Sequence, residues 1–539
     1  MKILTADQMR EVDRLTTAAY GVPSILLMEN AAARTVESIE KKLGSMRDRN
    51  ALVICAKGNN GGDGAAVARL LHAKGALVDV LLLGRADEAR GDARANFEIA
   101  RQLAANDSRF RFVEIENVEQ LKQKAASRSH DILIDAIFGT GLARPAAGLF
   151  EEAIQFINQL RNDLPIISVD IPSGVASDSS ELIGPAVRAH LTVTFTAPKI
   201  GNILPPASDY SGELVVAPIG SPDELINNSG SRLNLVERGD VQAWLAASRR
   251  SAHANKGDVG KVLVIAGSRG KTGAASMAGE GAMRAGAGLV TVATAESSQP
   301  VVASRVIVEC MTEPLPETAS GTIAREAADR ALELAAAAHV VAIGPGLGSS
   351  EESTRAFVRA FLMKRERPVV VDADGLNSLV PWAENLRGTV ELPLILTPHP
   401  GEMARLTGKQ ISEVVRHRVE IAREFATMHQ VVVVLKGSRT LIAAPDGEVY
   451  VNPTGNAGMA SGGTGDVLTG IIAGLVAQKM DDPIAATIAA VYLHGLAGDI
   501  AASRKGLRAM VATDIPSHLG DAFIEMGGDA ERLVTRSLI

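Results

Sequence analysis

The chain has 539 residues, a formal net charge of −7 and only 3% aromatic residues. This length exceeds one ordinary hydrophobic core, and at about 150 residues per domain it predicts two to four domains. The mild negative charge argues against a nucleic-acid-binding or membrane-surface protein, and the abundance of Ala, Gly and Val favours helices on parallel sheets over a β-sandwich.

Cys55 and Cys310 are the only two cysteines, and they lie far apart without a CxxC or His/Cys ligand spacing. We therefore expect neither a disulfide nor a zinc framework, and assign both as small buried hydrophobes. Residues 1–7 lack the apolar core of a signal peptide, and no run is long and charge-free enough to span a bilayer. These features predict a cytoplasmic protein without nucleic-acid or membrane partners.

The N-terminal segment begins with helical periodicity from Thr5 to about Lys42, interrupted at 21–24, where Pro23 and Ser24 indicate a break and a new helix start. An apolar strand at 51–56 then runs into a glycine-rich turn at 57–64, followed by a helix from Ala65. In parallel α/β sheets, a strand followed by a glycine turn and a helix is the arrangement that binds ligands at the carboxyl end of the strand. The turn departs from GxGxxG and from the P-loop. Either it binds a polar ligand or cation, or it is an Asn-Gly turn without a ligand.

Two further strands end in the same way. The strand at 131–138 leads into 139–145, and the strand at 166–171 leads into 172–174. Asp135 and Asp170 are therefore candidates for ion binding and acid–base chemistry, and the glycines of 139–141 would let a phosphate-bearing ligand approach the backbone. Each aspartate alone could be only a turn residue. The convergence of three such loops favours a site.

This ordered set of motifs, from Leu4-Thr5-Ala6 to Thr196-Ala197-Pro198-Lys199-Ile200-Gly201, resembles the NAD(P)H-hydrate epimerase domain. The resemblance implies a Rossmann-like three-layer α/β/α fold that interconverts the R and S forms of NADHX and NADPHX, in which water has added at C6 of the nicotinamide. Since epimerisation must open and reform the C6–O bond, we choose Asp170 as the acid–base residue. The resemblance implies a potassium ion held by Asn60, Asp135 and Ser173. The implied substrate-binding residues are Asn59, Asn60, Gly61, Gly62, Asp63, Gly139, Thr140, Gly141, Leu142, Ala143, Arg144, Pro145 and Asp170.

A boundary follows, because Pro, Asn, Ser and Gly accumulate between Ser221 and about Gly239. We predict domains at 1–225 and 240–539, joined by a linker at 226–239. The halves share no repeated motif, so a duplication is not expected.

The second half contains five further strands that end in polar or glycine-rich loops. Strands alternating with helices at this spacing predict a second parallel α/β domain. Gly270-Lys271-Thr272 is not a Walker A motif, because Ala266 stands where the first glycine is required. The strands and their loops are 262–266 with 267–275, 340–343 with 344–348, 369–371 with 372–377, 394–396 with 397–402, and 431–435 with 436–440.

Residues 456–475 predict a glycine-rich loop that runs into a buried helix, with Asp466 at the junction. The unpaired N–H groups and dipole of a helix start can hold phosphate oxygens, and a carboxylate there could act as a base. Asp466 either has that role or caps the helix.

His399, between two prolines at the end of a strand, is either structural or held toward the site, and we favour the second interpretation. Lys436 is either an ordinary strand-end charge or a phosphate ligand.

This second order of motifs resembles the NAD(P)H-hydrate dehydratase domain of the ribokinase-like superfamily, from Lys256 to Asp499. In that family the bacterial enzymes use ADP and the eukaryotic ones ATP, and we expect ADP with Mg²⁺. No clear ligand set for the metal is visible in the sequence. The implied substrate residues are Ala275, Gly346, His399 and Asp466, and the implied nucleotide residues are Lys436, Gly437, Ser438, Arg439, Thr440 and Gly465.

The sequence therefore predicts a bifunctional repair enzyme that acts on NADHX, NADPHX and ADP, and we expect a homo-oligomer. In the expected mechanism, Asp466 takes the proton of the C6 hydroxyl as that oxygen attacks the terminal phosphate of ADP, and the helix start stabilises the transferring group. Elimination then returns NAD(P)H with AMP and phosphate. The alternatives are a ribokinase-type small-molecule kinase and a non-catalytic nucleotide-binding protein.

Overall fold

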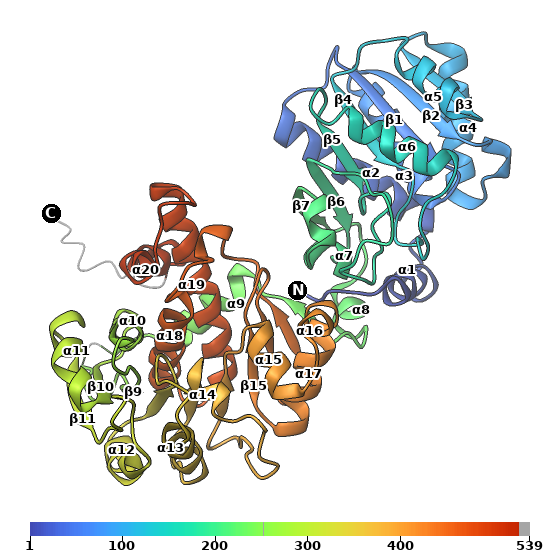
Figure 1. The fold of residues 1–539 in the computed structure, drawn as a ribbon. Helices are drawn as coiled ribbons and strands as arrows, with labels where there is room; N and C mark the ends of the chain where they lie inside the picture. Colours follow the sequence, from blue (N-terminus) through green and yellow to red (C-terminus); the bar gives the residue numbers. More distant parts are fainter. Residues whose placement is uncertain (252, 528–539) are drawn as a thin grey trace, which may run out of the picture. The chain divides into compact units, whose positions relative to one another are not determined.

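The structure is a computed structural model that describes residues 1–251 and 253–527, and it forms two compact units, Met1–Ser231 and Arg232–Ile539 (Figure 1). The division falls inside 226–239, the predicted linker, and Leu233–Leu235 within that segment forms a strand of the second unit. The predicted end of the second domain, residue 539, lies outside the described residues.

The N-terminal unit is built on a parallel sheet of seven strands in the order β3-β2-β1-β4-β5-β6-β7. The central strands are apolar and fully buried, as expected when helices cover both faces. The strands are β1 (Asn50–Ala56), β2 (Leu77–Leu83), β3 (Phe110–Ile115), β4 (Ile132–Ala136), β5 (Ile166–Val169), β6 (Leu191–Phe195) and β7 (Glu213–Ala217).

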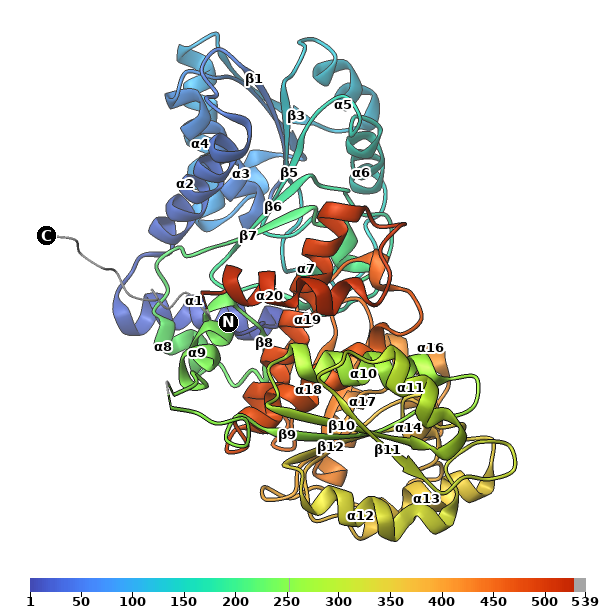
Figure 2. The same cartoon turned by 90° about the vertical axis from the view of Figure 1, so that its left-hand side faces the viewer.

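Two layers of helices enclose this sheet (Figure 2). Helices α2, α3 and α4 pack on one face and α5 and α6 on the other, each over its own apolar cluster. The predicted three-layer α/β/α fold is confirmed. The helices are α1 (Ala6–Tyr20), α2 (Ser24–Leu43), α3 (Asn59–Ala73), η1 (Ala86–Glu88), α4 (Gly91–Asn106), α5 (Val118–Ala125), α6 (Leu149–Gln159), α7 (Ile200–Ile203), η2 (Ala207–Tyr210) and α8 (Asp223–Asn227).

The strand order reverses between β1 and β4, where the chain leaves the sheet in opposite directions. In open α/β sheets a crevice forms at such a point, outside the carboxyl ends of the strands. The segment after β1 and the loop after β4 flank this crevice, so the fold brings two of the predicted loops together.

One boundary in this unit differs from the prediction. The glycine-rich segment after β1 is helical almost from its beginning, because α3 starts at Asn59 and its N-cap is Gly58. A Cβ atom on Gly61 would lie 1.6 Å from the carbonyl oxygen of Ala56, and one on Gly64 would lie 2.4 Å from the Cβ of Ala136. These glycines therefore let α3 pack closely on the sheet rather than forming a turn.

The C-terminal unit contains a ten-stranded sheet in the order β11-β10-β9-β12-β13-β14-β15-β16-β17-β8. Its strands are parallel except that β16 runs antiparallel to β15 and β17. The predicted parallel α/β domain is confirmed, with an antiparallel extension. The strands are β8 (Leu233–Leu235), β9 (Lys261–Ile265), β10 (Leu289–Ala295), β11 (Met311–Leu315), β12 (Val340–Ile343), β13 (Val369–Val371), β14 (Leu394–Leu396), β15 (Val432–Leu435), β16 (Leu441–Ala443) and β17 (Val449–Val451).

Helices again cover both faces, with α10 and α18 on one face and α12 and α13 on the other (Figure 2). The helices are α9 (Arg238–Ala247), α10 (Thr272–Arg284), η3 (Glu296–Ser298), α11 (Gln299–Arg305), η4 (Arg325–Ala327), α12 (Ala328–Ala336), α13 (Glu352–Met363), α14 (Asp374–Asn377), α15 (Pro400–Thr407), α16 (Ile411–Arg416), α17 (Arg418–His429), η5 (Ala457–Met459), α18 (Thr464–Gln478), α19 (Pro483–Lys505) and α20 (Asp514–Glu525).

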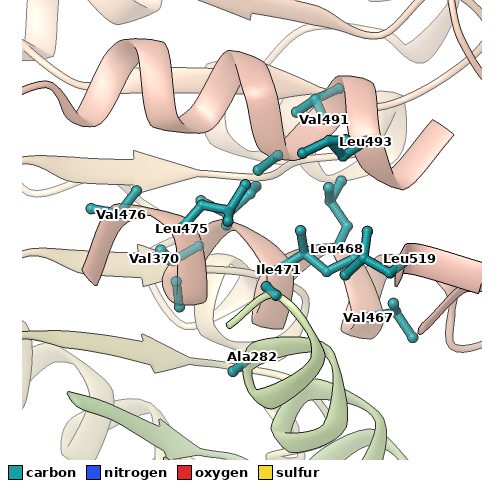
Figure 3. Close-up of a cluster of buried hydrophobic side chains, with 14 of the residues drawn as sticks. Ala282, Val370, Val467, Leu468, Ile471, Leu475, Val476, Val491, Leu493 and Leu519 are labelled. Atoms are coloured by element: carbon teal, nitrogen blue, oxygen red, sulfur yellow. The ribbon is translucent and has the colours of Figure 1, made fainter. Parts of the chain in front are cut away.

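Helix α18 is the centre of the second core. Its residues from Val467 to Ala477 are all buried, as expected for a helix that is apolar on every side. Figure 3 shows its side chains between Ala282 of α10, Val370 of β13, Val491 of α19 and Leu519 of α20. The core therefore holds the start of α18 in a fixed position at the edge of the sheet.

We expected no segment that could span a bilayer, and by the criteria of length and composition this expectation is wrong. Helix α19 is the one helix, within the described part of the chain, that is long and apolar enough for this test. Most of it is buried against α18 and α20. Its apolar composition is explained by this place in the core.

Candidate active sites

The first candidate site surrounds Asp170, which follows β5. Its backbone is left-handed, with φ of 67°, a conformation that Asp tolerates better than most residues. Lys199 Nζ donates to Asp170 Oδ1 over 2.5 Å, and Thr194 Oγ1 donates to the same oxygen over 3.1 Å. Lys199 is itself almost fully buried. The loop after β5 and the segment after β6 thus join in one buried ion pair.

Two more carboxylates belong to this site, Asp13 from α1 and Asp63 from α3. Burial raises the pKa of Asp13 to about 6, with the cation of Lys199 acting against this rise and the charge of Asp170 adding to it. Burial, followed by the charges of Asp170 and Asp13, raises the pKa of Asp63 well above its usual value. Three carboxylates and one lysine therefore share this region, where burial favours the protonated forms of Asp13 and Asp63.

The residues predicted for potassium lie beside this cluster. Asp135 is fully buried and accepts hydrogen bonds from Ser173 Oγ at 2.5 Å and from Ser168 Oγ at 2.7 Å. Burial raises the pKa of Asp135, although these hydrogen bonds oppose the rise. A Cβ atom on Gly139 would lie 3.3 Å from Asn60 Oδ1, so the loop after β4 contacts the start of α3. The structure therefore joins Asp135 directly to Ser173, and places Asn60 against the β4 loop.

The remaining predicted substrate residues fall into two environments. Gly61 and Gly62 are buried in α3, where Gly62 packs against Ala93 of α4. Asn59 is exposed. The loop at 139–145 is irregular and its residues range from half-buried to exposed, so its backbone is accessible to a ligand.

The second candidate site lies at the ends of three neighbouring strands, β13, β14 and β15. Lys436 Nζ donates to Asp372 Oδ1 over 2.6 Å and lies 3.9 Å from Glu402 Oε2. Thr397 Oγ1 also donates to Asp372 Oδ1, over 2.8 Å. Burial by itself lowers the pKa of Lys436, but the surrounding carboxylates outweigh burial and raise it overall.

Asp466 belongs to this cluster and is not the helix cap. Gly463 occupies the N-cap position of α18, with φ of 96°, so Asp466 is the third residue of the helix. Burial, followed by the neighbouring charge of Asp372, raises the pKa of Asp466 to about 7, while Lys436 acts in the opposite direction. A carboxyl group that exchanges its proton near neutral pH suits a general base.

The helix start also meets the lysine directly. A Cβ atom on Gly465 would lie 3.1 Å from Lys436 Nζ and 3.7 Å from Asp372 Oδ2. The first N–H groups of α18, which have no partner within the helix, therefore lie next to the only cation of this cluster among the described residues. Such a combination of N–H groups and ammonium suits the oxygens of a phosphate.

The other three residues predicted to bind the hydrated substrate differ in their burial and surroundings. Ala275 is fully buried in α10. Gly346 accepts a hydrogen bond from Ser268 Oγ at 2.7 Å, and its φ of 64° favours glycine. His399 is the N-cap of α15, and its Nδ1 accepts from the backbone of Gly401 at 2.9 Å. Since half of its side chain is exposed, His399 both caps a helix and reaches the surface of the site.

The loop predicted to bind the adenine nucleotide is held by side chains that donate to its backbone carbonyls. Arg418 donates to the carbonyl of Ser438 over 2.7 Å and to that of Arg439 over 3.2 Å. Thr440 Oγ1 donates to the carbonyl of Gly437 over 2.9 Å. Beyond Lys436, the loop is therefore ordered by the side chains of Thr440 and of Arg418 from α17.

The structure adds residues that the sequence analysis did not assign. Asp13, Lys199, Asp372 and Glu402 all contribute to the charged clusters. The last three stand in motifs that mark strand ends, which could have identified them. Asp13 lies within an ordinary amphipathic helix, and no local signal distinguishes it.

Two family models match the chain. The model described as YjeF-related protein N-terminus matches residues 24–201, and the model described as NAD(P)H-hydrate dehydratase matches residues 262–520. Each match covers the strand-end loops of one candidate site.

Similar proteins span the whole chain. The bifunctional NAD(P)H-hydrate repair enzyme Nnr of Moorella thermoacetica is 43% identical over 542 residues, covering 100% of this chain and 99% of the relative. The enzyme of the same name from Thermofilum pendens is 39% identical over 539 residues, with the same shares covered. The crystal structure of ADP/ATP-dependent NAD(P)H-hydrate dehydratase from Bacillus subtilis, co-crystallized with ATP/Mg²⁺, is 37% identical, covers 54% of this chain and 98% of that chain, and has a TM-score of 0.48.

Proposed function

Because the chain belongs to the family of bifunctional NAD(P)H-hydrate repair enzymes, we propose that it restores hydrated NADH and NADPH in two steps. The N-terminal unit interconverts the R and S epimers of NADHX and NADPHX. The C-terminal unit dehydrates the S epimer to NAD(P)H and converts ADP to AMP and phosphate. Both epimers are thereby recovered by one chain.

The observation that carries this proposal is the position of Asp466 in the first turn of α18, beside Lys436. A base, a cation and unpaired N–H groups meet there, which are the parts that transfer of a phosphoryl group to a hydroxyl requires. A scaffold protein would not need the carboxyl group of Asp466, because Lys436 is already paired with Asp372 and burying a further charge costs free energy.

The proposed first reaction uses Asp170 at C6 of the nicotinamide ring. The lone pair of the ring nitrogen forms an iminium as the C6–O bond breaks, and the hydroxyl leaves as water after gaining a proton. Water then adds to the other face and gives up a proton. Asp170, held by Lys199 at 2.5 Å, is the carboxylate placed for this proton exchange.

The predicted potassium site fits the residues present. Asp135 is fully buried, and its hydrogen bonds from Ser168 and Ser173 come from neutral groups. Within the described residues, the buried Asn60 Nδ2 has no hydrogen-bond partner, and turning this amide would present its oxygen instead. A potassium ion held by Asn60, Asp135 and Ser173 would compensate the buried carboxylate and order the loops around it.

In the proposed second reaction, Asp466 removes the proton of the C6 hydroxyl while that oxygen attacks the terminal phosphate of ADP. The O–P bond to the AMP part breaks, and the N–H groups at the start of α18 stabilise the transferring group. The C6 phosphoester then loses phosphate together with a proton from C5, which restores the ring double bond. Lys436 to Thr440 and Gly465 are the proposed nucleotide contacts.

Mg²⁺ bound to ADP would neutralise the diphosphate beside the carboxylates of Asp372 and Asp466. No group of three or more His, Cys, Asp or Glu side chains in the described ranges is arranged to hold a metal. We therefore assign the nucleotide itself as the main ligand of the metal. The Bacillus subtilis dehydratase was likewise crystallized with ATP and Mg²⁺.

The alternative of a ribokinase-type kinase is less well supported. The full-length similarity is to bifunctional repair enzymes, and both units carry a cluster of a buried lysine with carboxylates. A kinase of this type would need only the C-terminal unit.

Incubation of the purified protein with mixed R and S NADHX and ADP tests the proposal, with reduced nicotinamide followed by absorbance. Full recovery is expected. Recovery that stops when the S epimer is exhausted would contradict the epimerase, and no recovery would contradict the dehydratase. The expected homo-oligomer is a separate proposal, which light scattering tests against the monomer mass of 56.3 kDa.

A further inference from the structure

Asp13 of α1 lies in the buried cluster of Asp170 and Lys199, and one of its carboxylate oxygens has no hydrogen-bond partner among the described residues. In the described part of the chain, its buried Oδ1 accepts no hydrogen bond. Lys199 cannot serve it, because its three donors are directed to Asp170 at 2.5 Å, Thr194 Oγ1 at 2.8 Å and the carbonyl of Phe195 at 3.2 Å. A buried carboxylate oxygen without a donor is costly and is explained when a ligand supplies the partner.

The position of this carboxylate is set by several anchors of α1. The backbone N–H of Ala6 donates to Asp178 Oδ1 over 2.7 Å, and Leu4 N–H donates to the carbonyl of Pro198 over 3.0 Å. Val12, the neighbour of Asp13, packs in one apolar cluster with Ala197. The helix is therefore fixed against the segment that carries Lys199.

Charged groups from several elements lie around Asp13. Lys199 and Asp170 face it from the segments after β6 and β5, and Asp63 lies in the same charge cluster on α3. On α1 itself, the nearby Arg10 and Arg14 are exposed and paired with Asp7 and Glu11. The ammonium of Lys199 donates to Asp170, so Asp13 is the carboxyl group of the two without a cationic hydrogen bond.

We propose that Asp13 is a second acid–base residue of the epimerase reaction, acting on the C6 oxygen together with Asp170. This inference rests on the proposed epimerase function. Asp13 gives its proton to the C6 hydroxyl as the ring nitrogen forms the iminium, so that water leaves and Asp13 becomes ionised. Water adds to the other face of C6 and gives a proton to Asp170. Return of that proton to Asp13 restores both groups, so no proton or electron is gained or lost over the cycle.

The direct test is the Asp13→Asn variant in the full chain. Interconversion of purified R and S NADHX is followed by chromatography without ADP, and the rate without enzyme is subtracted. The account predicts that kcat falls at least about 100-fold, the usual contribution of a positioned acid or base, with little change in KM. Asp13→Glu, which keeps the carboxyl group, should retain much more activity.

The pH profile distinguishes chemistry from structure. Because the acid must be protonated, kcat/KM of the unmodified chain should fall as the pH rises above about 6, the raised pKa of Asp13. This limb should disappear in Asp13→Asn and be retained in Asp13→Glu. Asp7→Asn, an exposed change on the same helix, is the matched control and should leave rate and profile unchanged.

The control is the dehydratase activity of each preparation, measured with S NADHX and ADP. It reports whether the C-terminal unit of the variant chain is folded and active. Asp13→Asn with normal kcat, or with only a raised KM and an unchanged pH limb, would overturn the role of Asp13. If the unmodified chain fails to interconvert the epimers, the proposed epimerase function itself is wrong. A failure of the Asp13 proposal therefore shows in the Asp13→Asn variant, whereas a failure of the proposed epimerase function shows in the unmodified chain.

Discussion

Lys436 and Asp372 form an ion pair of 2.6 Å between the ends of β15 and β13, two strands separated by β14. The pair spans the edge where Asp466 and Glu402 also lie. Neither charge is well solvated, since the side chain of Asp372 is 1% exposed and that of Lys436 is 20% exposed. The pair therefore carries both stability and the charge balance of the proposed dehydratase site.

Lys436→Met should destabilise the C-terminal unit by roughly 3 kcal/mol, because it leaves Asp372 buried without its cation. Both tryptophans of the chain, Trp244 and Trp382, lie in this unit, so their fluorescence during urea unfolding reports it selectively. Addition of Asp372→Asn should recover part of the loss. A Lys436→Met chain as stable as the original would contradict the importance of the pair.

Asp466 should give the dehydratase a dependence on pH that opposes the one expected of the epimerase. A base acts in its ionised form, so kcat/KM for dehydration should rise with pH and level off above about 7, the raised pKa of Asp466. Steady-state rates with S NADHX and ADP between about pH 6 and 8 test this expectation. A flat profile would mean that the proton is removed by another group.

Gly463 should be required for the shape of the helix start. With φ of 96°, Gly463→Ala is strained, and the end of the Met277 side chain, whose Sδ lies 2.5 Å from the position of an added Cβ, would have to move. We expect a loss of about 2 kcal/mol in the tryptophan-monitored unfolding of the unit. Gly462→Ala is the matched control, because an added Cβ would meet nothing within 4 Å among the described residues. Equal stability of the two variants would contradict this role of Gly463.

Gly64 should be required for packing of α3 rather than for binding a ligand. An added Cβ would lie 2.4 Å from the Cβ of Ala136 and 2.9 Å from Cys55 Sγ, so Gly64→Ala should destabilise the N-terminal unit by about 2 kcal/mol. Epimerase activity should then be lost at a lower temperature, while dehydratase activity is unaffected. Gly58→Ser, at an open N-cap position, should be tolerated. Unchanged heat inactivation of Gly64→Ala would contradict the packing argument.

Much of the architecture follows from local patterns. Short apolar runs followed by polar or glycine-rich segments predicted β1, β4, β5, β9, β12, β13, β14 and β15, and parallel strands necessarily bring such ends to one edge. This is why local sequence patterns alone suffice to select Asp170 and Asp466 as candidates. The fold places each of them in a buried charged cluster.

Other features depend on contacts that no local pattern records. The glycines at 61 and 64 predict a turn, because glycine commonly interrupts helices, yet the closeness of β1 and β4 requires them inside α3. Asp13 follows the normal polar spacing of an amphipathic helix, and only the packing of α1 brings it to Lys199. The composition of α19 likewise cannot distinguish a buried core helix from a membrane helix.

The central claim is that one chain holds two independent active sites, and complementation between two variants tests it most directly. Asp170→Asn keeps a side chain that tolerates the left-handed backbone, and Asp466→Asn preserves the size of the base. With mixed NADHX epimers and ADP, recovery of reduced nicotinamide is measured for each variant alone and for both together. The account predicts that Asp170→Asn stops once the S epimer is consumed, that Asp466→Asn recovers almost none, and that the mixture recovers all. Full, rapid recovery by Asp170→Asn alone, or a mixture that stops at the S fraction, would contradict it.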